Sequence, residues 1–257
     1  MRPAMQQRVA LVTGASRGIG RSIAQRLAAD GLRIVASARS EGALAELVSD
    51  LGEGHEAVAM DVGDGASVEA AVAQVVARVG AVDVLVNNAG IAESYPYDRT
   101  DDDAWERHMR INAQGPMRLC RALVPKMVER GWGRVVTVAS NAGLIGYAYS
   151  SAYCASKHAI IGYQRALALE VAKAGVTVNA VCPGWVDTEM AARAVANIAE
   201  KTGRSDEDAK KALTRMSPQG RMTQPEEVAD LVAMLCSDAA GNIHGQAIAI
   251  DGGQVMQ

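Results

Sequence analysis

Phenylalanine is absent from this 257-residue chain, so any aromatic contact to a ligand must come from its six tyrosines and three tryptophans. No stretch approaches about 18 consecutive apolar residues, and the sequence therefore predicts no transmembrane helix. The formal net charge is only −3, with both signs interspersed and no basic stripe, which argues against a nucleic-acid partner. Residues 1–8 lack the apolar region of a signal peptide, and we expect a cytoplasmic protein.

Cysteine and histidine are scarce and scattered. The four cysteines include no Cys-x-x-Cys pair, which favours buried free thiols in a reducing compartment over a metal or redox site. The four histidines also lack ligand-like spacing, and we interpret them as structural or surface groups. The sequence thus predicts no metal centre. The residues concerned are Cys120, Cys154, Cys182, Cys236, His55, His108, His158 and His244.

Apolar β-rich runs alternate with helical patterns along the whole chain, and 49% of the residues are hydrophobic. This alternation predicts an α/β fold, a single-domain Rossmann-type doubly wound parallel sheet of about seven strands with helices on both faces, spanning 1–257. Strands are expected at 8–13, 32–38, 56–60, 82–86, 134–139, 176–181 and 247–250. Helices are expected after residue 20 and at 41–51, 65–79, 101–129, 151–173, 189–215 and 225–236.

A glycine-rich turn follows the first predicted strand, with Gly14, Gly18 and Gly20 in the spacing Gly-x-x-x-Gly-x-Gly. Strand, glycine turn and helix together build a phosphate cradle at a helix N-terminus. The alternative is a simple tight β–α turn that binds no ligand. The position of the turn between a strand and a helix favours nucleotide binding.

The end of the second predicted strand indicates which dinucleotide would bind. An acidic residue there would accept from the ribose 2′-hydroxyl of NAD, but none occurs before Glu41. Arg39 stands at this point and Arg17 lies in the glycine turn, and guanidinium groups pair well with a 2′-phosphate. We therefore expect NADP(H) in preference to NAD(H). The alternative is that one of these arginines is a solvated loop residue.

Three residues with acid–base or hydrogen-bonding potential follow the predicted strand 134–139. Ser140 comes at its end, and Tyr153 and Lys157 are four apart on the next helix, which places them on one face. A neighbouring ammonium favours the phenolate and is expected to lower the pKa of Tyr153. Such a set suits reversible ketone reduction, although Tyr-x-x-x-Lys alone is more often a surface helix pair.

Residues of special chemistry recur where strands end, at Gly14, Arg39, Asp61, Asn87, Ser140 and Pro183. In an open parallel sheet ligands bind outside the carboxyl ends of the strands, so these positions should converge on one site. A further unusual position is Asn112, in the middle of the helical stretch 101–129 and shortly before Gly115-Pro116. Asparagine is disfavoured inside helices and proline breaks them, so we expect a kink there.

Taken together, these motifs resemble the short-chain dehydrogenase/reductase family over essentially the whole chain. The carrying residues are Thr13-Gly14-x-x-x-Gly18-x-Gly20, Asn87-Asn88-Ala89-Gly90, Asn112, Ser140, Tyr153-x-x-x-Lys157 and Pro183-Gly184. The one minor departure is Ala139, where a second serine often precedes the catalytic one. Within the family, residues 152–190 are most similar to bacterial 3-oxoacyl thioester reductases and aromatic-polyketide ketoreductases.

The resemblance implies roles. Tyr153 would be the acid/base, Lys157 would tune it and hold the nicotinamide ribose, and Ser140 would position the carbonyl. Asn112 would hold a water that links Lys157 to solvent, and it completes the implied catalytic set. The implied cofactor-binding residues are Gly14, Ser16, Arg17, Gly18, Ile19, Gly20, Arg39, Asp61, Val62, Asn88, Ala89, Gly90, Tyr153, Lys157, Pro183, Gly184, Val186 and Thr188.

The substrate side is less well marked. Loops expected near the site carry Tyr95, Tyr97, Tyr147, Tyr149 and Trp185, which would suit an apolar or aromatic ketone, or would pack on one another. Residues 189–222 would form a mobile substrate lid, whose mixed charges we interpret as a solvated helix face rather than a site for a phosphopantetheine or CoA arm. The expected substrate-binding residues are Ser140, Tyr147, Tyr149, Tyr153, Trp185 and Met190.

The sequence thus predicts an NADP(H)-dependent oxidoreductase that reduces a ketone to a secondary alcohol, the ketone being a 3-oxoacyl thioester, a polyketide or an aryl or alkyl ketone. The substrate would be a small molecule, including CoA or acyl-carrier thioesters. The alternatives are an NAD-dependent secondary alcohol or 3-hydroxyacyl dehydrogenase working oxidatively, a non-catalytic nucleotide-binding scaffold, and a lyase or dehalogenase on the same frame. The resemblance also implies a homotetramer.

Overall fold

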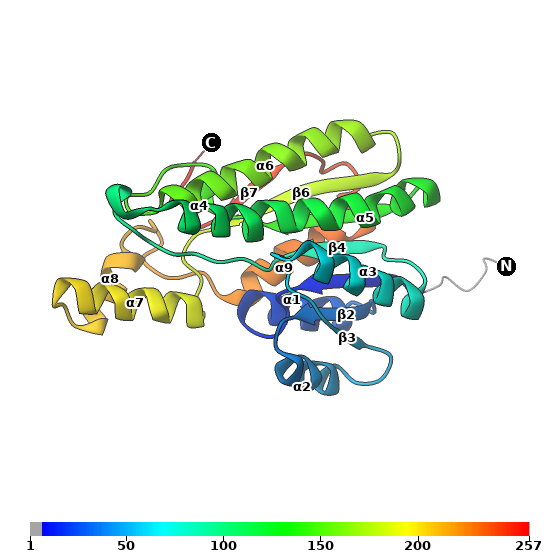
Figure 1. Ribbon diagram of the computed structural model, residues 1–257, viewed down its shortest axis with the longest axis horizontal. Coiled ribbons are helices and arrows are strands. Elements are labelled where there is room, and N and C mark those ends of the chain that lie inside the picture. Colours follow the sequence, from blue (N-terminus) through cyan, green and yellow to red (C-terminus); the bar gives the residue numbers. More distant parts are fainter. Residues whose placement is uncertain (1–6, 257) are drawn as a thin grey trace.

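Seven strands form one parallel sheet in the computed structural model of the protein, which describes residues 7–256 (Figure 1). The expectation for residues 1–8 therefore falls largely outside the described part of the chain. The order across the sheet is β3-β2-β1-β4-β5-β6-β7. The strands are β1 (Val9–Thr13), β2 (Arg33–Ala38), β3 (Glu56–Ala59), β4 (Val84–Asn87), β5 (Gly133–Val138), β6 (Val176–Pro183) and β7 (Ala247–Ile250).

Helices alternate with these strands and lie on both faces of the sheet (Figure 1), which confirms the predicted single Rossmann-type domain. The α-helices are α1 (Gly18–Ala29), α2 (Glu41–Leu51), α3 (Gly65–Val79), α4 (Asp102–Met109), α5 (Gly115–Arg130), α6 (Ser151–Val171), α7 (Glu189–Thr202), α8 (Asp206–Thr214) and α9 (Pro225–Cys236). Short turns η1 (Tyr97–Arg99), η2 (Arg110–Gln114), η3 (Asn141–Gly143) and η4 (Asp238–Ala240) complete the described elements.

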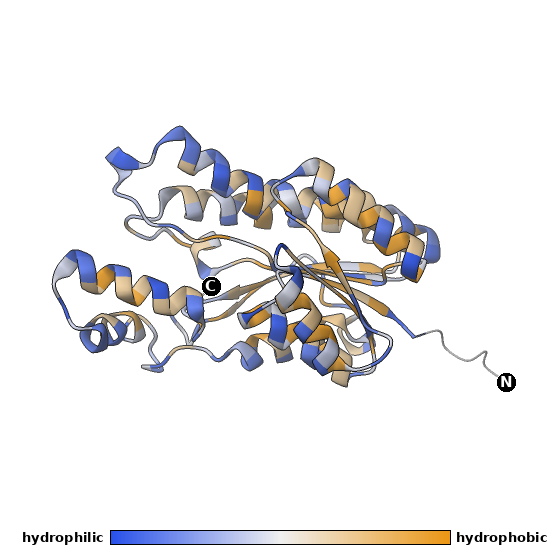
Figure 2. Ribbon diagram, turned by 60° about the horizontal axis from the view of Figure 1, so that its bottom comes forward, coloured by the Kyte–Doolittle hydropathy of each residue, from blue (hydrophilic) through white to orange (hydrophobic). Residues whose placement is uncertain are grey.

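The hydrophobic core is divided between the two faces of the sheet. Along β1, Ala10 and Val12 pack with α1, α2 and α9, whereas Val9 and Leu11 pack with α3, α5 and α6. Side chains alternate across a strand, and helices cover both faces, so nearly every strand residue must be apolar. Figure 2 shows these hydrophobic strands between helices whose outer faces are largely hydrophilic.

The strand order reverses between β1 and β4, because β2 and β3 lie on one side of β1 and the later strands on the other. At such a reversal the connections leave in opposite directions and open a crevice outside the carboxyl ends of the strands. The glycine turn after β1 and Asn87 at the end of β4 both border this point. The sheet therefore brings the predicted residues to one edge.

Two predicted helices differ from the structure. The stretch 101–129 is interrupted by a π-helical turn, η2, which lies before Pro116, so the irregularity is centred on Asn112 and the proline simply starts α5. The expected helix 189–215 is two helices, because Gly203 ends α7 in the left-handed conformation at φ 68° and Ser205 caps α8.

Helices α7 and α8 form a hairpin that extends away from the rest of the molecule (Figure 1). Its own small apolar cluster contains Ala191, Val195, Leu213 and Met222, with Trp185 packed against it. The hairpin is thus held together mainly by its own residues. Among the helices of residues 7–256, none combines the length and hydrophobicity that crossing a membrane requires.

Candidate active site

The turn between β1 and α1 is locked onto the end of β4 by side-chain hydrogen bonds. Thr13 Oγ1 accepts from the backbone amides of Asn88 at 3.0 Å and Ala89 at 3.1 Å. The Asn88 side-chain amide donates to the carbonyl of Thr13 at 2.8 Å and to that of Gly14 at 3.2 Å. Asn88 therefore supports the turn, in addition to the ligand contact that the sequence suggested.

The glycines of this turn stand where a side chain would clash with neighbouring atoms or where the backbone adopts a positive φ. A Cβ on Gly20 would lie 2.3 Å from the Gly14 carbonyl oxygen, and Gly14 and Gly18 have φ values of +64° and +52°. No side chain caps the first turn of α1, so its amide groups point outward from the N-terminus. These features fit a dinucleotide pyrophosphate, which binds amide groups at a helix N-terminus.

The two arginines expected at a 2′-phosphate are both exposed. Arg39 follows the end of β2. Arg17 donates from Nη1 to the Glu189 carboxylate at 2.9 Å, which links the glycine turn to the start of α7. Close by, a Cβ on Gly18 would lie 3.3 Å from Thr188 Cγ2, so the turn and the beginning of the hairpin are in contact.

Ser140, Tyr153 and Lys157 converge at the carboxyl end of β5. Ser140 Oγ accepts from the Ala142 amide at 3.1 Å, and the Ser140 side chain lies near enough to the Tyr153 hydroxyl to lower the pKa of that group. Lys157 is buried, donates to the Val138 carbonyl at 3.0 Å and lies 5.8 Å from the centroid of the Tyr153 ring. The structure thus brings together the three residues that the spacing placed on one site.

The pKa values in this cluster are governed by burial. Burial raises the pKa of Tyr153 above its ordinary value, and the neighbouring Ser140 side chain only partly opposes that rise. Burial also lowers the pKa of Lys157 to about 8, against the attraction of Cys182. The pKa of Tyr153 is therefore raised and not lowered as expected, because burial is the largest influence on it.

Asn112 lies buried on the π-helical turn and makes three hydrogen bonds. Its Oδ1 accepts from the Ile91 amide at 2.9 Å, and its Nδ2 donates to the Ile91 carbonyl and to Ser156 Oγ, each at 3.0 Å. A Cβ on Gly90 would lie 3.1 Å from Asn112 Oδ1 and 3.6 Å from Lys157 Nζ, so both residues border Gly90. The π turn thus places Asn112 beside the same glycine as Lys157.

The remaining expected cofactor residues border the same edge. Asp61 Oδ1 accepts from the Gly63 amide at 2.9 Å, and the Val62 carbonyl lies 2.7 Å from where a Cβ on Gly115 would be. Thr188 begins α7 and donates to the Val186 carbonyl at 3.3 Å. The other members of the expected set lie on the glycine turn, after β4 or at the end of β6. They are Ser16, Ile19, Ala89, Pro183 and Gly184.

The aromatic residues expected at the substrate have different surroundings. Tyr147 is partly buried, its hydroxyl is buried without a hydrogen-bond partner, and burial raises its pKa to about 12. Tyr149 is 67% exposed and has a φ of +64°, which is strained for a tyrosine. Trp185 packs on the hairpin cluster, and Met190 is exposed at the start of α7. Tyr97, at 89% exposed, lies on the surface.

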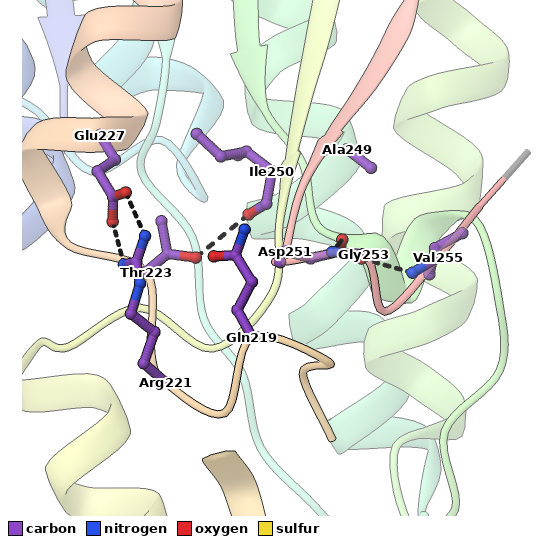
Figure 3. Close-up of a pocket in the computed structure, with 10 residues that line it drawn as sticks. Gln219, Arg221, Thr223, Glu227, Ala249, Ile250, Asp251, Gly253 and Val255 are labelled. Carbon is purple, nitrogen blue, oxygen red and sulfur yellow. Dashed lines mark hydrogen bonds and ion pairs between the residues drawn. The ribbon is translucent and has the colours of Figure 1, made fainter. Parts of the chain in front are cut away.

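The two ends of the hairpin are fixed to each other and to the sheet. The Asp187 amide donates to the Thr223 carbonyl and the Thr223 amide to the Trp185 carbonyl, each at 2.9 Å. Figure 3 shows a pocket at this base, where Arg221 forms two hydrogen bonds with Glu227 at 2.6 and 2.7 Å and Thr223 lies beside Ile250. This pocket is not lined by Ser140, Tyr153 or Lys157.

Four residues near the site were not assigned a role there from the sequence. Thr13 and Ser156 act through hydroxyl groups whose partners are distant in sequence. Asn141, next to Ser140, donates to Asp251 at 3.2 Å and to Gln254 at 3.1 Å. His108 is fully buried beside Tyr153. Thr13 stood in the motif of the glycine turn and Asn141 stood next to Ser140, whereas Ser156 and His108 gave no sequence signal.

Metal-binding side chains do not gather in the described part of the chain, where no three His, Cys, Asp or Glu residues form a group that could hold an ion. The four cysteines are buried and free. The site therefore consists of hydroxyl, ammonium and amide groups beside a glycine turn.

Comparison with known proteins gives consistent matches. The family described as short chain dehydrogenase matches residues 8–199. A candidate ketoacyl reductase of Streptomyces coelicolor is 42% identical over 250 residues, which are 95% of this chain and 96% of that protein. The 3-oxoacyl-(acyl-carrier-protein) reductase of Escherichia coli is 38% identical over 250 residues, covering 97% and 98%.

A solved structure is also similar over almost its whole length. The crystal structure of a variant of actinorhodin polyketide ketoreductase with NADPH has a TM-score of 0.92 and 41% sequence identity. The match covers 96% of this chain and 97% of that one.

Proposed function

Because the chain belongs to the short-chain dehydrogenase family, we propose that it reduces a ketone to a secondary alcohol with NADPH, using Ser140, Tyr153 and Lys157. The observation that carries the proposal is the convergence of these three side chains beside the glycine turn. A hydroxyl that can give a proton, a second hydroxyl near it and a buried ammonium meet at the carboxyl edge of the sheet. This combination provides general acid catalysis at a carbonyl.

In the proposed reaction the substrate carbonyl oxygen lies against Ser140 and Tyr153. Ser140 donates a hydrogen bond that orients and polarises the carbonyl, and Tyr153 gives its proton to the same oxygen. The raised pKa of Tyr153 keeps the phenol protonated and ready to donate. NADPH, when bound, supplies the hydride.

Lys157 and Asn112 return the catalytic tyrosine to its protonated state. The ammonium stabilises the phenolate left on Tyr153 after proton transfer, since opposite charges at short range favour each other. Asn112 and Lys157 border the same glycine, Gly90, which places the amide where it could hold a water beside the ammonium. Through that water the proton lost by Tyr153 would be replaced from solvent.

The glycine turn and its neighbours would hold NADPH. The amides of Gly18, Ile19 and Gly20 at the start of α1 face the pyrophosphate position, and Arg17 and Arg39 supply positive charge for the 2′-phosphate. We assign Asp61 and Val62 to the adenine side, Lys157 to the nicotinamide ribose and Thr188 to the carboxamide. The crystal structure of the ketoreductase variant with NADPH supports this preference.

The substrate class is proposed to be 3-oxoacyl thioesters or polyketides, presented on CoA or an acyl carrier. The names of the relatives support it, as does Tyr147, whose buried unpaired hydroxyl can take a second polar group of such a substrate. We propose that residues 189–222 act as the lid, since both its ends are fixed at Trp185–Thr223 while the hairpin between them packs on itself.

We further propose a cytoplasmic homotetramer. Four buried free thiols suit a reducing compartment. Leu169 on α6 is 82% exposed, Trp105 on α4 is 44% exposed, and the apolar edge strand β7 is only partly covered. These surfaces would be buried between subunits through α4, α5 and α6 and through the C-terminal edge. Light scattering of the purified protein would show a monomer if this part of the proposal is wrong.

Titration of the protein with NADPH and NADH tests the coenzyme preference. We expect NADPH to bind more tightly in the wild type and the Arg39→Asp variant to lose about ten-fold or more in NADPH affinity, because a carboxylate would repel the 2′-phosphate. Arg204→Asp, on the exposed end of the hairpin, is the matched charge control and should bind both coenzymes as the wild type does.

Tighter NADH binding that is indifferent to Arg39 would contradict the coenzyme assignment and favour an oxidative alcohol dehydrogenase. Binding of neither coenzyme would favour a scaffold. Turnover of a panel of 3-oxoacyl thioesters and aryl ketones with NADPH would then separate the proposed substrate class from simple ketones.

A further inference from the structure

We propose that His108 is a positioning residue of the active site, which as a neutral imidazole fixes both the ring of Tyr153 and the segment 91–96. The inference rests on the proposed role of Tyr153 as the proton donor. His108 lies on α4, one helical turn before Asn112, and is 0% exposed. Of the histidines in the described chain, it is the one whose ring packs against Tyr153.

The hydrogen bonds of His108 determine its protonation. Its Nδ1 lies 2.7 Å from the Ala104 carbonyl oxygen, which can only accept, so Nδ1 carries a hydrogen. Its Nε2 lies 3.2 Å from the Glu93 backbone amide, which can only donate, so Nε2 presents a lone pair. Both contacts exist together only in the neutral imidazole. A second proton would set two N–H groups against each other and break the Glu93 contact.

The contact at Glu93 anchors a segment that reaches the substrate side. The Glu93 carboxylate accepts from Arg107 Nη2 at 2.7 Å and from the Tyr95 hydroxyl at 3.2 Å. The Tyr95 amide in turn donates to the Tyr149 carbonyl at 2.8 Å. Through these bonds His108 connects α4 to the loop 144–150, which carries Tyr147 and leads into α6. Loss of the anchor would loosen that loop.

The ring of His108 also contacts the catalytic residue directly. The His108 and Tyr153 rings lie edge to face, with centroids 6.3 Å apart and planes at 70°. Such pairs fix the orientation of both rings. The imidazole therefore forms one wall against the phenol, whose ring centroid also lies 5.8 Å from Lys157 Nζ.

The charged and titratable groups that face His108 come from three elements. Glu93 and Tyr95 lie on the segment, Arg107 on α4 and Tyr153 on α6. Although burial opposes it, the hydrogen bond and charge of Arg107 hold the pKa of Glu93 below its ordinary range, so this carboxylate stays charged in mild acid. The Glu93 side chain therefore keeps its hydrogen bonds with Arg107 and Tyr95, and its backbone amide depends on the acceptor that His108 provides.

Two substitutions separate positioning from packing. His108→Gln keeps an acceptor for the Glu93 amide, whereas His108→Leu keeps the volume and loses the acceptor. We expect kcat/KM for ketone reduction to fall about ten-fold in His108→Leu at pH 7 and to stay within about three-fold of the wild type in His108→Gln. Recovery of activity in His108→Gln is the sign of positioning, because an acceptor alone would not restore a role that depends only on packing.

His244 supplies the matched control. It also accepts from a backbone amide, that of Val178, and faces a carbonyl, that of Ala168, but it lies between α6 and β6 at a distance from Tyr153. His244→Leu should lower thermal stability and leave kcat/KM within about two-fold of the wild type.

The inference is overturned if His108→Leu behaves kinetically as His244→Leu does, or if His108→Gln loses as much activity as His108→Leu. If His108→Leu does not fold, His108→Gln decides alone, and a loss of more than about three-fold in its kcat/KM overturns the inference. Tyr153→Phe is measured in parallel: if it keeps full activity, the proposed function fails; if it is inactive, the result for His108 stands by itself.

Discussion

Among single residues, Lys157 is needed for the proposed chemistry but lowers the stability of the folded protein, because it is a charged group in a buried position. The side chain is only 6% exposed, and burial lowers its pKa from 10.5 to about 8. At neutral pH the lysine is nevertheless protonated, in the folded and in the unfolded chain, so the folded protein holds a desolvated ammonium. Because 1.36 kcal/mol corresponds to one pKa unit, this costs on the order of 3 kcal/mol of folding free energy.

We therefore predict that Lys157→Met raises the free energy of unfolding at pH 7 by about 2 kcal/mol while removing ketone reduction. Methionine removes the desolvation cost of the buried ammonium, which stabilises the variant. The variant also loses the hydrogen bond to the Val138 carbonyl, and this loss destabilises it by roughly 1 kcal/mol. Chemical denaturation at pH 7 and pH 9 measures the effect.

The pH dependence has a definite sign. Because the pKa of Lys157 is lowered in the folded protein, the desolvation cost of its ammonium is fully present below about pH 8. This cost disappears as the pH rises toward 10.5, since the folded protein then holds a neutral lysine. The advantage of the variant over the wild type should thus be smaller at pH 9 than at pH 7. Lys173→Met, an exposed lysine after α6, should change stability by no more than about 0.5 kcal/mol. Equal stability of Lys157→Met and the wild type at pH 7 would contradict the assignment of Lys157 as a buried ammonium that destabilises the fold.

The identity of the catalytic side chains could be predicted from the sequence, but their electrostatics could not. Spacing placed Tyr153 and Lys157 on one helix face, and the preceding strand placed Ser140 near them. The pKa of Tyr153 instead depends on how deeply α4 and β5 bury it, which is set by packing across the fold. For the same reason the position of His108 against Tyr153 had no signal in the sequence.

At the scale of elements, the glycine turn and the hairpin are joined by one ion pair, between Arg17 and Glu189. Both side chains are more than half exposed, at 56% and 66%, so the pair contributes little to stability. Its consequence lies in binding: Arg17 is proposed to meet the 2′-phosphate, and Glu189 competes with that phosphate for the same guanidinium.

We predict that Glu189→Gln binds NADPH about two- to five-fold more tightly than the wild type and binds NADH equally well, because only NADPH carries the 2′-phosphate. Fluorescence titration with both coenzymes measures it. Glu200→Gln, which removes an exposed carboxylate further along α7, is the control and should leave both affinities unchanged. An equal gain for NADH, or a gain in the control, would mean that only the overall charge matters.

Most elements could be predicted from periodicity, and the two that differed have physical reasons. The π turn η2 at Asn112 is held by hydrogen bonds to Ile91 and Ser156, which are distant in sequence. The break between α7 and α8 was visible in principle, since Gly203 and Ser205 form a helix stop followed by a cap. The Ala-rich pattern on both sides concealed it.

At the scale of the whole molecule, the fold explains why residues from distant parts of the chain meet. The parallel sheet places every strand's carboxyl end on one edge, and the reversal between β1 and β4 opens the crevice there. The alternation of strands and helices was sufficient to predict this arrangement. The substrate could not be predicted, because it depends on the hairpin and on loops such as 144–150, whose conformations the periodic pattern does not determine.

We propose that this edge of the sheet reduces ketones with NADPH through Tyr153. The most direct test is NADPH consumption with a 3-oxoacyl thioester by the wild type and by Tyr153→Phe, with the NADPH affinity of each measured alongside. We predict turnover by the wild type and a loss of about 100-fold or more in kcat in the variant, with affinity unchanged within about two-fold. Retained turnover in Tyr153→Phe, or a wild type that binds NADPH yet reduces no ketone, would contradict it.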